Sequence, residues 1–399
     1  MSRADLSDDM EERRPRVLHI GDYWNGGGAE KVLRDTVEAS EILGNVNEVF
    51  TGDNIRSGPL SYVFSLCTVV KASAVLQRFR PDVIHLQNFY HRLSPSVLWT
   101  LSRYKRKFPT TKIVFTAHDM HLVCPNSGFQ YFTSGEAHNI SISDASINIF
   151  RRYDQRGLAY SSLKIMQHIV AYKILKLYRH IDVVITPSHF LKNLLKAHHK
   201  ELSYEVIRNP INQGGATASN YRRWGDSNQI KIVFFGRVSK EKGLSEFIRL
   251  CLPLFENENI SLDIFGDGPE KSALQSLAAS CNLTSQIRFM GQISADHVQS
   301  AMKNYSLLVL PSTWYENAPL VICEAAAAGL PVLVRSSGGA EELAGEVRWG
   351  ISSDLSNVES TWADIKLLAS HAGQNELLEP NQFSEANYAS QLSKTYHRA

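Results

Sequence analysis

Cysteine is scarce in this chain of 399 residues, and the few cysteines lie far apart. No two of them have the CxxC spacing of a zinc site, and their odd number does not suit a disulfide framework. They stand at Cys67, Cys124, Cys251, Cys281 and Cys323. This scarcity excludes a small disulfide-stapled fold and is typical of a protein from a reducing cytoplasm.

Long apolar runs are lacking as well. No run reaches the ~18 residues that a membrane-spanning helix needs, and the polar segment Met1–Arg14 has no apolar core typical of a signal peptide. The composition, with 43% hydrophobic and 21% charged residues, is that of a soluble globular protein. Because 399 residues exceed one ordinary hydrophobic core, we expect two domains.

The chain lacks a large net charge, because 42 Lys+Arg are nearly balanced by 40 Asp+Glu. The charges are nevertheless unevenly divided along the chain. Residues 1–209 contain 27 Lys+Arg against 20 Asp+Glu, a balance of +7, and the remainder contains 15 against 20, a balance of −5. The basic first half suggests an anionic partner such as a membrane surface or a diphosphate. Nucleic acid is disfavoured, because no recognisable nucleic-acid-binding module is present.

The most informative stretch runs from Leu307 to Ser337. Its pattern predicts a buried strand over 307–310, a loop that carries Glu316, a short helix over 320–328 and a second strand over 332–334. We expect Asn317 to be the N-cap of the helix, with Pro319 in its first turn. Strand–helix–strand with short connections is typical of a parallel α/β unit, whose helix N-termini point to the edge where ligands bind.

A second carboxylate, Glu324, lies inside that apolar, Ala-rich helix. A solvated surface Glu is the ordinary interpretation, but an acid surrounded by apolar residues needs a partner, and a ribose diol would suit it. The pattern Glu316-x7-Glu324 followed by AAAAGLPVL resembles the donor-site signature of the retaining GT-B glycosyltransferases of family 4. The resemblance extends over almost the whole chain.

That resemblance implies an α/β fold of the GT-B type. Two Rossmann-like domains with parallel sheets would face a central cleft, and a C-terminal helix would cross back to the first domain. We therefore predict an acceptor-side domain over 1–208, a donor domain over 209–378 and a returning helix within 379–399. The Gly/Ser/Asn-rich stretch 212–228 supports a boundary near residue 209.

In the first half, the pattern predicts a strand over 16–20, the glycine-rich loop 21–29 and a helix over 30–40 that buries Val32, Leu33, Thr36 and Val37. On the pattern alone, the loop is as compatible with a tight turn as with a ligand loop. The resemblance implies that Gly27 and Gly28 lie against the donor diphosphate. It also implies that His118, in TAHD after the strand 112–116, approaches the donor sugar and diphosphate. For Asp119 we expect no more than an orienting role toward that histidine. His85 and His121 are weaker candidates on the acceptor side.

In the second half, a strand over 230–235 leads into GRVSKEKG and a helix over 244–251. Arg237 and Lys242 are well suited to a diphosphate, because Arg grips two oxygens and Lys adds a point charge. Both match the phosphate-binding pair of the family, whereas Lys240 is expected to be a surface charge. The resemblance also implies donor-binding roles for Gly266, Ile293, Asn317, Ala318, Pro319 and Leu320.

Two segments of the first half allow more than one interpretation. Residues 124–154 are polar and irregular, either a disordered loop or an acceptor loop. For 163–180 we expect one helix whose apolar stripe packs on the core and whose Lys and Arg side chains face solvent; a membrane-surface helix is the alternative. That stripe consists of Leu163, Met166, Val170, Ile174 and Leu177.

The resulting functional hypothesis is an enzyme, a metal-independent hexosyltransferase. It would move a hexose from a UDP- or GDP-sugar, with retention, to a saccharide or polyprenyl-diphosphate-linked acceptor in cell-surface polysaccharide biosynthesis. His118, Glu316, Arg237 and Lys242 would be catalytic and Glu324 would hold the ribose. We expect no cofactor and no metal, because Arg and Lys replace the metal and no DxD motif occurs in a suitable loop. We also expect a cytoplasmic location, with peripheral contact to an anionic inner leaflet.

Two alternatives remain at this point. A nucleotide-sugar 2-epimerase on the same fold would consume the donor without an acceptor. A non-catalytic nucleotide-sugar binding subunit would bind the donor without turnover, although the full set of charged site residues argues against it. A nicotinamide oxidoreductase is disfavoured, because the glycine fingerprint and its trailing acidic residue are missing.

Overall fold

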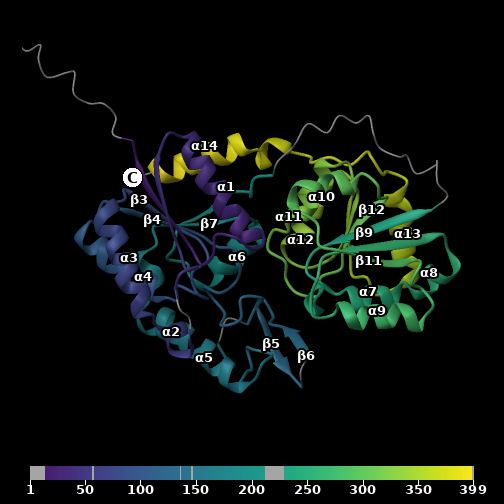
Figure 1. Ribbon diagram of the computed structural model, residues 1–399, viewed down its shortest axis with the longest axis horizontal. Helices are drawn as coiled ribbons and strands as arrows, with labels where there is room; N and C mark the ends of the chain where they lie inside the picture. The colour runs from purple at the N-terminus through teal and green to yellow at the C-terminus, as the bar shows by residue number, and fades with distance from the viewer. Residues whose placement is uncertain (1–13, 56–57, 135, 145–146, 212–228, 398–399) are drawn as a thin grey trace, which may run out of the picture.

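Two six-stranded parallel sheets form the framework of the protein (Figure 1). The computed structural model describes residues 14–55, 58–134, 136–144, 147–211 and 229–397. The first sheet has the strand order β2-β1-β3-β4-β7-β8. Its strands are β1 (Arg16–Gly21), β2 (Val46–Thr51), β3 (Val83–Leu86), β4 (Lys112–Thr116), β7 (Val183–Thr186) and β8 (Tyr204–Val206).

The second sheet has the order β11-β10-β9-β12-β13-β14. Its strands are β9 (Ile230–Phe235), β10 (Ile260–Phe265), β11 (Ile287–Gly291), β12 (Leu307–Leu310), β13 (Val332–Arg335) and β14 (Gly350–Ser353). In both sheets the winding direction reverses beside the first strand, between β1 and β3 and between β9 and β12. Ligands of open α/β sheets bind at the carboxyl ends of the strands at such a reversal. The predicted two-sheet GT-B architecture is confirmed.

Helices cover both faces of the sheets, as parallel strands buried on both sides require. The helical segments of the first half are α1 (Gly28–Ile42), α2 (Pro59–Val63), α3 (Leu66–Phe79), α4 (Ser96–Lys107), α5 (Leu158–His168), η1 (Ile169–Ile174), η2 (Leu177–His180) and α6 (His189–His198). Those that follow β9 are η4 (Lys240–Lys242), α7 (Leu244–Leu250), α8 (Leu252–Asn257), α9 (Lys271–Ser280), α10 (Ala295–Met302), α11 (Leu320–Ala327), α12 (Gly339–Ala344), α13 (Val358–Ala369), η5 (Pro380–Phe383) and α14 (Glu385–His397).

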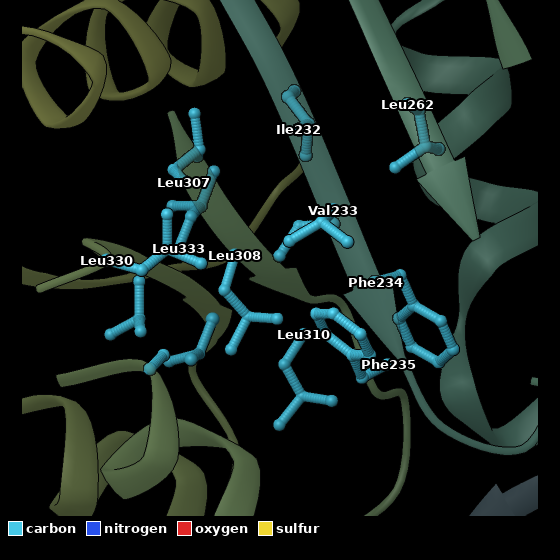
Figure 2. Close-up of a cluster of buried hydrophobic side chains, with 14 of the residues drawn as sticks. Ile232, Val233, Phe234, Phe235, Leu262, Leu307, Leu308, Leu310, Leu330 and Leu333 are labelled. Atoms are coloured by element: carbon cyan, nitrogen blue, oxygen red, sulfur yellow. The ribbon is translucent and has the colours of Figure 1, made fainter. Parts of the chain in front are cut away.

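The core of the second half forms around the near-continuous apolar runs of its central strands. Figure 2 shows side chains of β9, β12 and β13 converging in one cluster, among them Ile232, Leu308 and Leu333, all fully buried. In the first half, alternate residues of β1 serve two clusters: Leu18 belongs to one and Val17 to the other. Side chains of a strand point alternately to opposite faces, so each strand contributes to both layers.

The C-terminal helix α14 returns to the first half and packs beside α1 (Figure 1). Its Leu392 is fully buried among Val17, Val83 and Val114 of the first sheet. Two of its tyrosines make polar contacts there: Tyr388 Oη lies 2.7 Å from Thr36 Oγ1, and Tyr396 Oη lies 2.7 Å from His85 Nδ1. The predicted crossing helix is therefore present.

Two predictions for the first half need correction. The single helix expected over 163–180 consists of α5, the π-helical η1 and the 3-10 turn η2. Met166 and Ile174 of its apolar stripe are exposed rather than packed on the core. The segment 124–154 contains an antiparallel hairpin, β5 (Gln130–Thr133) with β6 (Glu136–Asn139), so it is not irregular throughout. The stretch 212–228 lies outside the described residues, and the boundary at 208/209 stays a prediction.

The docking of α14 yields a stability prediction. Replacing Leu392 with Ala removes a buried side chain and leaves a cavity, so we expect a loss of about 2–5 kcal/mol in the free energy of unfolding. Urea denaturation monitored by circular dichroism measures it. Lys394→Ala, an exposed position on the same helix, is the matched control and is expected to change stability by less than about 0.5 kcal/mol. Equal stability of the two variants would show that α14 is not anchored through Leu392.

Candidate functional site

An ion pair between Lys242 and Glu316 lies at the reversal point of the second sheet. Lys242 ends η4, in the connection that follows β9, and Glu316 lies in the loop that follows β12. Lys242 Nζ donates to Glu316 Oε1 over 2.6 Å, and Ser312 Oγ donates to the same oxygen over 2.6 Å. Glu316 is buried. Burial alone would raise the pKa of its carboxyl group, but the charge and hydrogen bond of Lys242, with help from Ser312, outweigh this and lower that pKa.

Arg237 follows the same strand β9 but remains exposed. No hydrogen bond or ion pair joins its guanidinium group to another residue in the described part of the chain. The turn beside it is tight, because Gly266 has φ +136 and a Cβ there would lie 1.8 Å from Gly236 O. The ends of β9 and β10 thus approach each other through two glycines, Gly236 and Gly266.

Asn317 has a different position from the one predicted. The helix α11 begins at Leu320 with Pro319 as its N-cap, so Asn317 is not the cap. Its side chain instead bridges the two halves: Ser188 Oγ donates to Asn317 Oδ1 over 2.7 Å, and Asn317 Nδ2 donates to the carbonyl of His118 over 3.0 Å. A short polar side chain just before a helix fits either role, and the neighbouring half decides between them.

His118 comes to the cleft from the first half. Its Nε2 lies 2.6 Å from Gln87 Oε1, so Gln87, at the end of β3, orients the ring. Burial lowers the pKa of His118 to about 4, which keeps the imidazole neutral near pH 7. A neutral imidazole in this place has one ring nitrogen left for a hydrogen bond with a ligand, and it does not take up a proton from that ligand.

Asp119 does not orient His118 as predicted. Its Oδ1 accepts a hydrogen bond of 2.9 Å from the backbone N–H of His121, and its Oδ2 accepts one from the hydroxyl of Tyr90. Burial raises the pKa of Asp119 to about 7, against the lowering effect of the backbone hydrogen bond. Asp119 is therefore held in place by the polypeptide around residues 90 and 121.

The two weaker histidine candidates are internal. His85 is fully buried between Tyr396 of α14 and Thr116, whose hydroxyl lies 2.7 Å from its Nε2. His121 is buried, stacks on the Tyr90 ring and lies 3.1 Å from both Tyr172 Oη and Gln167 Oε1. Neither lines the cleft described below, and a role on the acceptor side stays a prediction.

Glu324 lies within α11 and is half-buried. Burial raises the pKa of its carboxyl group, against the lowering effect of Lys31 on α1 of the first half. Within the described residues, no side chain forms a hydrogen bond with this carboxylate. The acid predicted to need a partner thus has none among the residues that the structure describes, and its oxygens are available to a ligand.

The two halves enclose a cleft of about 400 Å³ at the carboxyl ends of their strands. Of the predicted residues, those that line it are Gly28, His118, Asp119, Lys242, Glu316, Asn317, Ala318, Pro319 and Leu320. A Cβ on Gly28 would meet no atom within 4 Å, so the space above it is free for a ligand. Gly27, Arg237, Gly266, Ile293 and Glu324 lie outside this lining; Ile293 is half-buried against the second core.

Four residues that the sequence analysis did not assign belong to the same region. Ser312 bonds to Glu316, Gln87 to His118 and Ser188 to Asn317, and Trp314 lines the cleft. The sequence pattern could have indicated Gln87, because this residue follows a predicted strand at the edge where ligands bind. It could not have indicated the other three residues, since their roles depend on which loops the fold brings together. A larger hollow of about 890 Å³ lies at the opposite edge of the first sheet, beside Asp82 and Lys112, away from these groups.

The comparisons with known proteins agree with this geometry. Residues 26–213 match the family described as Glycosyltransferase Family 4, and residues 222–388 match Glycosyl transferases group 1. Together the two matches cover most of the chain. The protein belongs to the group 1 glycosyltransferases of the GT-B fold.

Among curated relatives of this glycosyltransferase, the uncharacterized glycosyltransferase MJ1607 of Methanocaldococcus jannaschii is 32% identical over 135 residues, which is 33% of this chain and 34% of that protein. Each of the first curated relatives is matched over less than two thirds of its own length.

Two solved structures match over nearly their full length. The apo form of the lipopolysaccharide outer core galactosyltransferase WaaB superposes with a TM-score of 0.64 at 14% identity, covering 95% of this chain and 98% of WaaB. Anabaena Alr3699/HepE in complex with UDP-glucose gives a TM-score of 0.61 at 18% identity, covering 96% and 99%. At these identities the likeness shows the fold.

The described residues contain no helix that is both long and apolar enough to cross a bilayer. They also contain no cluster of three or more His, Cys, Asp or Glu side chains that could hold a metal ion. Independence from metal and from other cofactors stays a prediction.

Asp119 generates a prediction about pH. In the folded chain the Asp119 carboxyl group keeps its proton up to about pH 7, whereas in the unfolded chain it releases the proton near pH 3.8. The free energy of unfolding therefore falls as pH rises between these two values. We expect Asp119→Asn to gain stability relative to wild type between about pH 5 and pH 8, by about 1–4 kcal/mol. Urea denaturation at both pH values measures the difference. A constant difference would mean that Asp119 titrates normally.

Proposed function

We propose that the protein transfers a hexosyl group from a nucleoside diphosphate sugar to a saccharide or lipid-linked saccharide, with retention at the anomeric carbon. The observation that carries the proposal is the set of groups around the reversal point of the second sheet. Arg237 is a cation that pairs with no described residue, Lys242 lies in the cleft, and Glu324 is a carboxylate without a hydrogen-bonding partner among the described side chains. These are the charges that a diphosphate and a ribose require.

In the proposed reaction, the bond between the anomeric carbon and the diphosphate oxygen breaks, and a bond to the acceptor oxygen forms. The leaving diphosphate takes the acceptor proton, so no separate protein base is needed. Arg237, Lys242 and the backbone amides around Gly27–Gly28 and Ala318–Leu320 stabilise the charge on the leaving group. Preorganised donors of this kind act on charge as it develops in the transition state.

Three further residues hold the donor in this proposal. Glu324 accepts hydrogen bonds from the ribose hydroxyls. Glu316, kept ionised by Lys242, accepts hydrogen bonds from hydroxyls of the sugar. Neutral His118 contacts the sugar and diphosphate from the first half, oriented by Gln87. Gly266 shapes the turn beside Arg237, and Ile293 packs against the nucleoside base.

The donor and acceptor classes draw support from the names of the structural neighbours. UDP-glucose in the HepE complex supports a nucleotide sugar, with UDP or GDP as the nucleotide. The name of WaaB supports a cell-surface saccharide acceptor, and hence a role in polysaccharide biosynthesis at the cytoplasmic side of the membrane.

Arg237 provides a test of the chemistry. Arg237→Ala removes a contact that strengthens in the transition state, so we expect turnover to fall ~10²-fold or more. Donor consumption is measured with and without a panel of lipid-linked saccharide acceptors. Lys240→Ala, an exposed charge in the same loop, is the control and is expected to keep wild-type turnover. Wild-type turnover in Arg237→Ala would remove Arg237 from the mechanism, and donor consumption without acceptor would favour the 2-epimerase.

Glu324 provides a test of donor binding that does not depend on the acceptor. Heat-unfolding midpoints are measured against a panel of nucleoside diphosphates and nucleotide sugars. A ligand at about 100 times its dissociation constant adds ~2.7 kcal/mol of stability, which shifts the midpoint visibly. We expect a shift with one nucleotide, lost in Glu324→Ala and kept in Glu359→Ala, an exposed Glu on α13. No shift with any nucleotide would contradict the site, and a shift without turnover would favour the binding subunit.

A further inference from the structure

The segment α5–η1 is built with its polar side inward. Ser161, Gln167 and His168 are buried, whereas apolar side chains of the same segment face solvent. Leu158 is 73% exposed, Met166 42% and Ile174 66%. Positions eight apart on an α-helix differ in direction by about 80°, so Leu158 and Met166 point to adjoining parts of the exposed side rather than along one line. The exposed side of the segment is therefore an apolar surface that no described part of the protein covers.

Hydrogen bonds hold the polar side in place. Gln167 Nε2 donates to the carbonyls of Tyr62 and Tyr90 over 2.6 and 2.9 Å, and Gln167 Oε1 lies 3.1 Å from His121 Nε2. A rotation that buried the apolar side would break these bonds and leave buried polar groups unpaired, which is unfavourable. The outward apolar side is thus part of the folded state.

The charges around this apolar side are positive. Positions 158–181 contain no acidic residue, and Lys173, Lys176 and Arg179 are exposed. Burial and, after it, the charge of Lys173 lower the pKa of His198 on α6. Of the nearby acids, Asp154 pairs with Arg156 and Lys164, and Glu201 interacts with Arg179 as well as with His199. Among the described residues, no acid pairs with Lys173 or Lys176.

A neighbouring helix extends the same surface. The short helix α2 contacts α5, and both lie at one end of the first half, away from the second half (Figure 1). Leu60 of α2 is 82% exposed. Leu175, next to Ile174, is also exposed, so the apolar pair stands between Lys173 and Lys176.

We infer that this surface docks on an anionic lipid bilayer. The docking surface consists of Leu60, Leu158, Met166, Ile174 and Leu175 together with Lys173, Lys176 and Arg179. Apolar side chains enter the boundary between headgroups and acyl chains, and the flanking cations attract anionic headgroups. A second copy of this chain fits less well, because a two-fold interface through the same surface would set cations against cations. Docking does not depend on the proposed transfer reaction.

Co-sedimentation with lipid vesicles tests the inference. Wild-type protein is expected to bind vesicles of phosphatidylcholine mixed with phosphatidylglycerol and to bind pure phosphatidylcholine much less. In Met166→Ser/Ile174→Ser, loss of the apolar side chains is expected to weaken binding about tenfold or more. In Lys173→Gln/Lys176→Gln, each lost charge is expected to weaken binding about fivefold. Leu367→Ser, an exposed apolar position on α13 of the second half, is expected to bind as wild type.

The outcomes separate the alternatives. Unchanged heat-unfolding midpoints in these surface variants, with selective loss of vesicle binding, support docking on the bilayer. Equal binding of wild type to neutral and anionic vesicles, or no binding to either, overturns it. A wild-type dimer in size-exclusion chromatography that Met166→Ser/Ile174→Ser converts to a monomer, without vesicle binding, assigns the surface to a second copy and also overturns it. Nucleotide-induced midpoint shifts measure the donor site independently.

Discussion

A buried carboxylate that requires a counter-charge determines how the cleft is built. Glu316 is buried after β12, and an ionised carboxylate is stable there only with a paired cation and hydrogen bonds. Lys242 reaches it because β9 and β12 are neighbours, and their loops press together at Gly243. A Cβ on Gly243 would lie 2.1 Å from Pro311 O, and the residue has φ +68, so glycine alone allows this approach.

The loop held by this ion pair also joins the two halves. Asn317, next to Glu316, bonds to Ser188 and to the backbone of His118. A second contact lies close by: the Glu342 carboxylate accepts the backbone N–H groups of His189 and Phe190 at the start of α6, over 2.9 and 2.7 Å. Arg208 pairs with Glu342 over 2.6 Å. These hydrogen bonds and the ion pair thus hold His118 close to the loop that follows β12 and carries Glu316.

The segment α5–η1 illustrates the limit of periodicity as a guide to orientation. Its apolar stripe has helical spacing, and such a stripe normally faces the core. Here Gln167 supplies three polar contacts to the interior, and the buried groups it contacts, around Tyr62, Tyr90 and His121, come from distant parts of the chain. Periodicity identifies two sides of a helix, but the partner groups decide which side is inside.

The sequence alone determined the alternation of strands and helices, the positions of Arg237, Lys242, Glu316 and Glu324 after strands or in an apolar helix, and the resemblance that named the fold. These features depend on local pattern and spacing, which a sequence displays directly. Only the tertiary structure decided that Asn317 bridges the halves, that His85 and His121 are internal, and that Asp119 is held by Tyr90 rather than by His118. Each of these depends on contacts between residues far apart in the chain, and such contacts arise from the packing of one element against another.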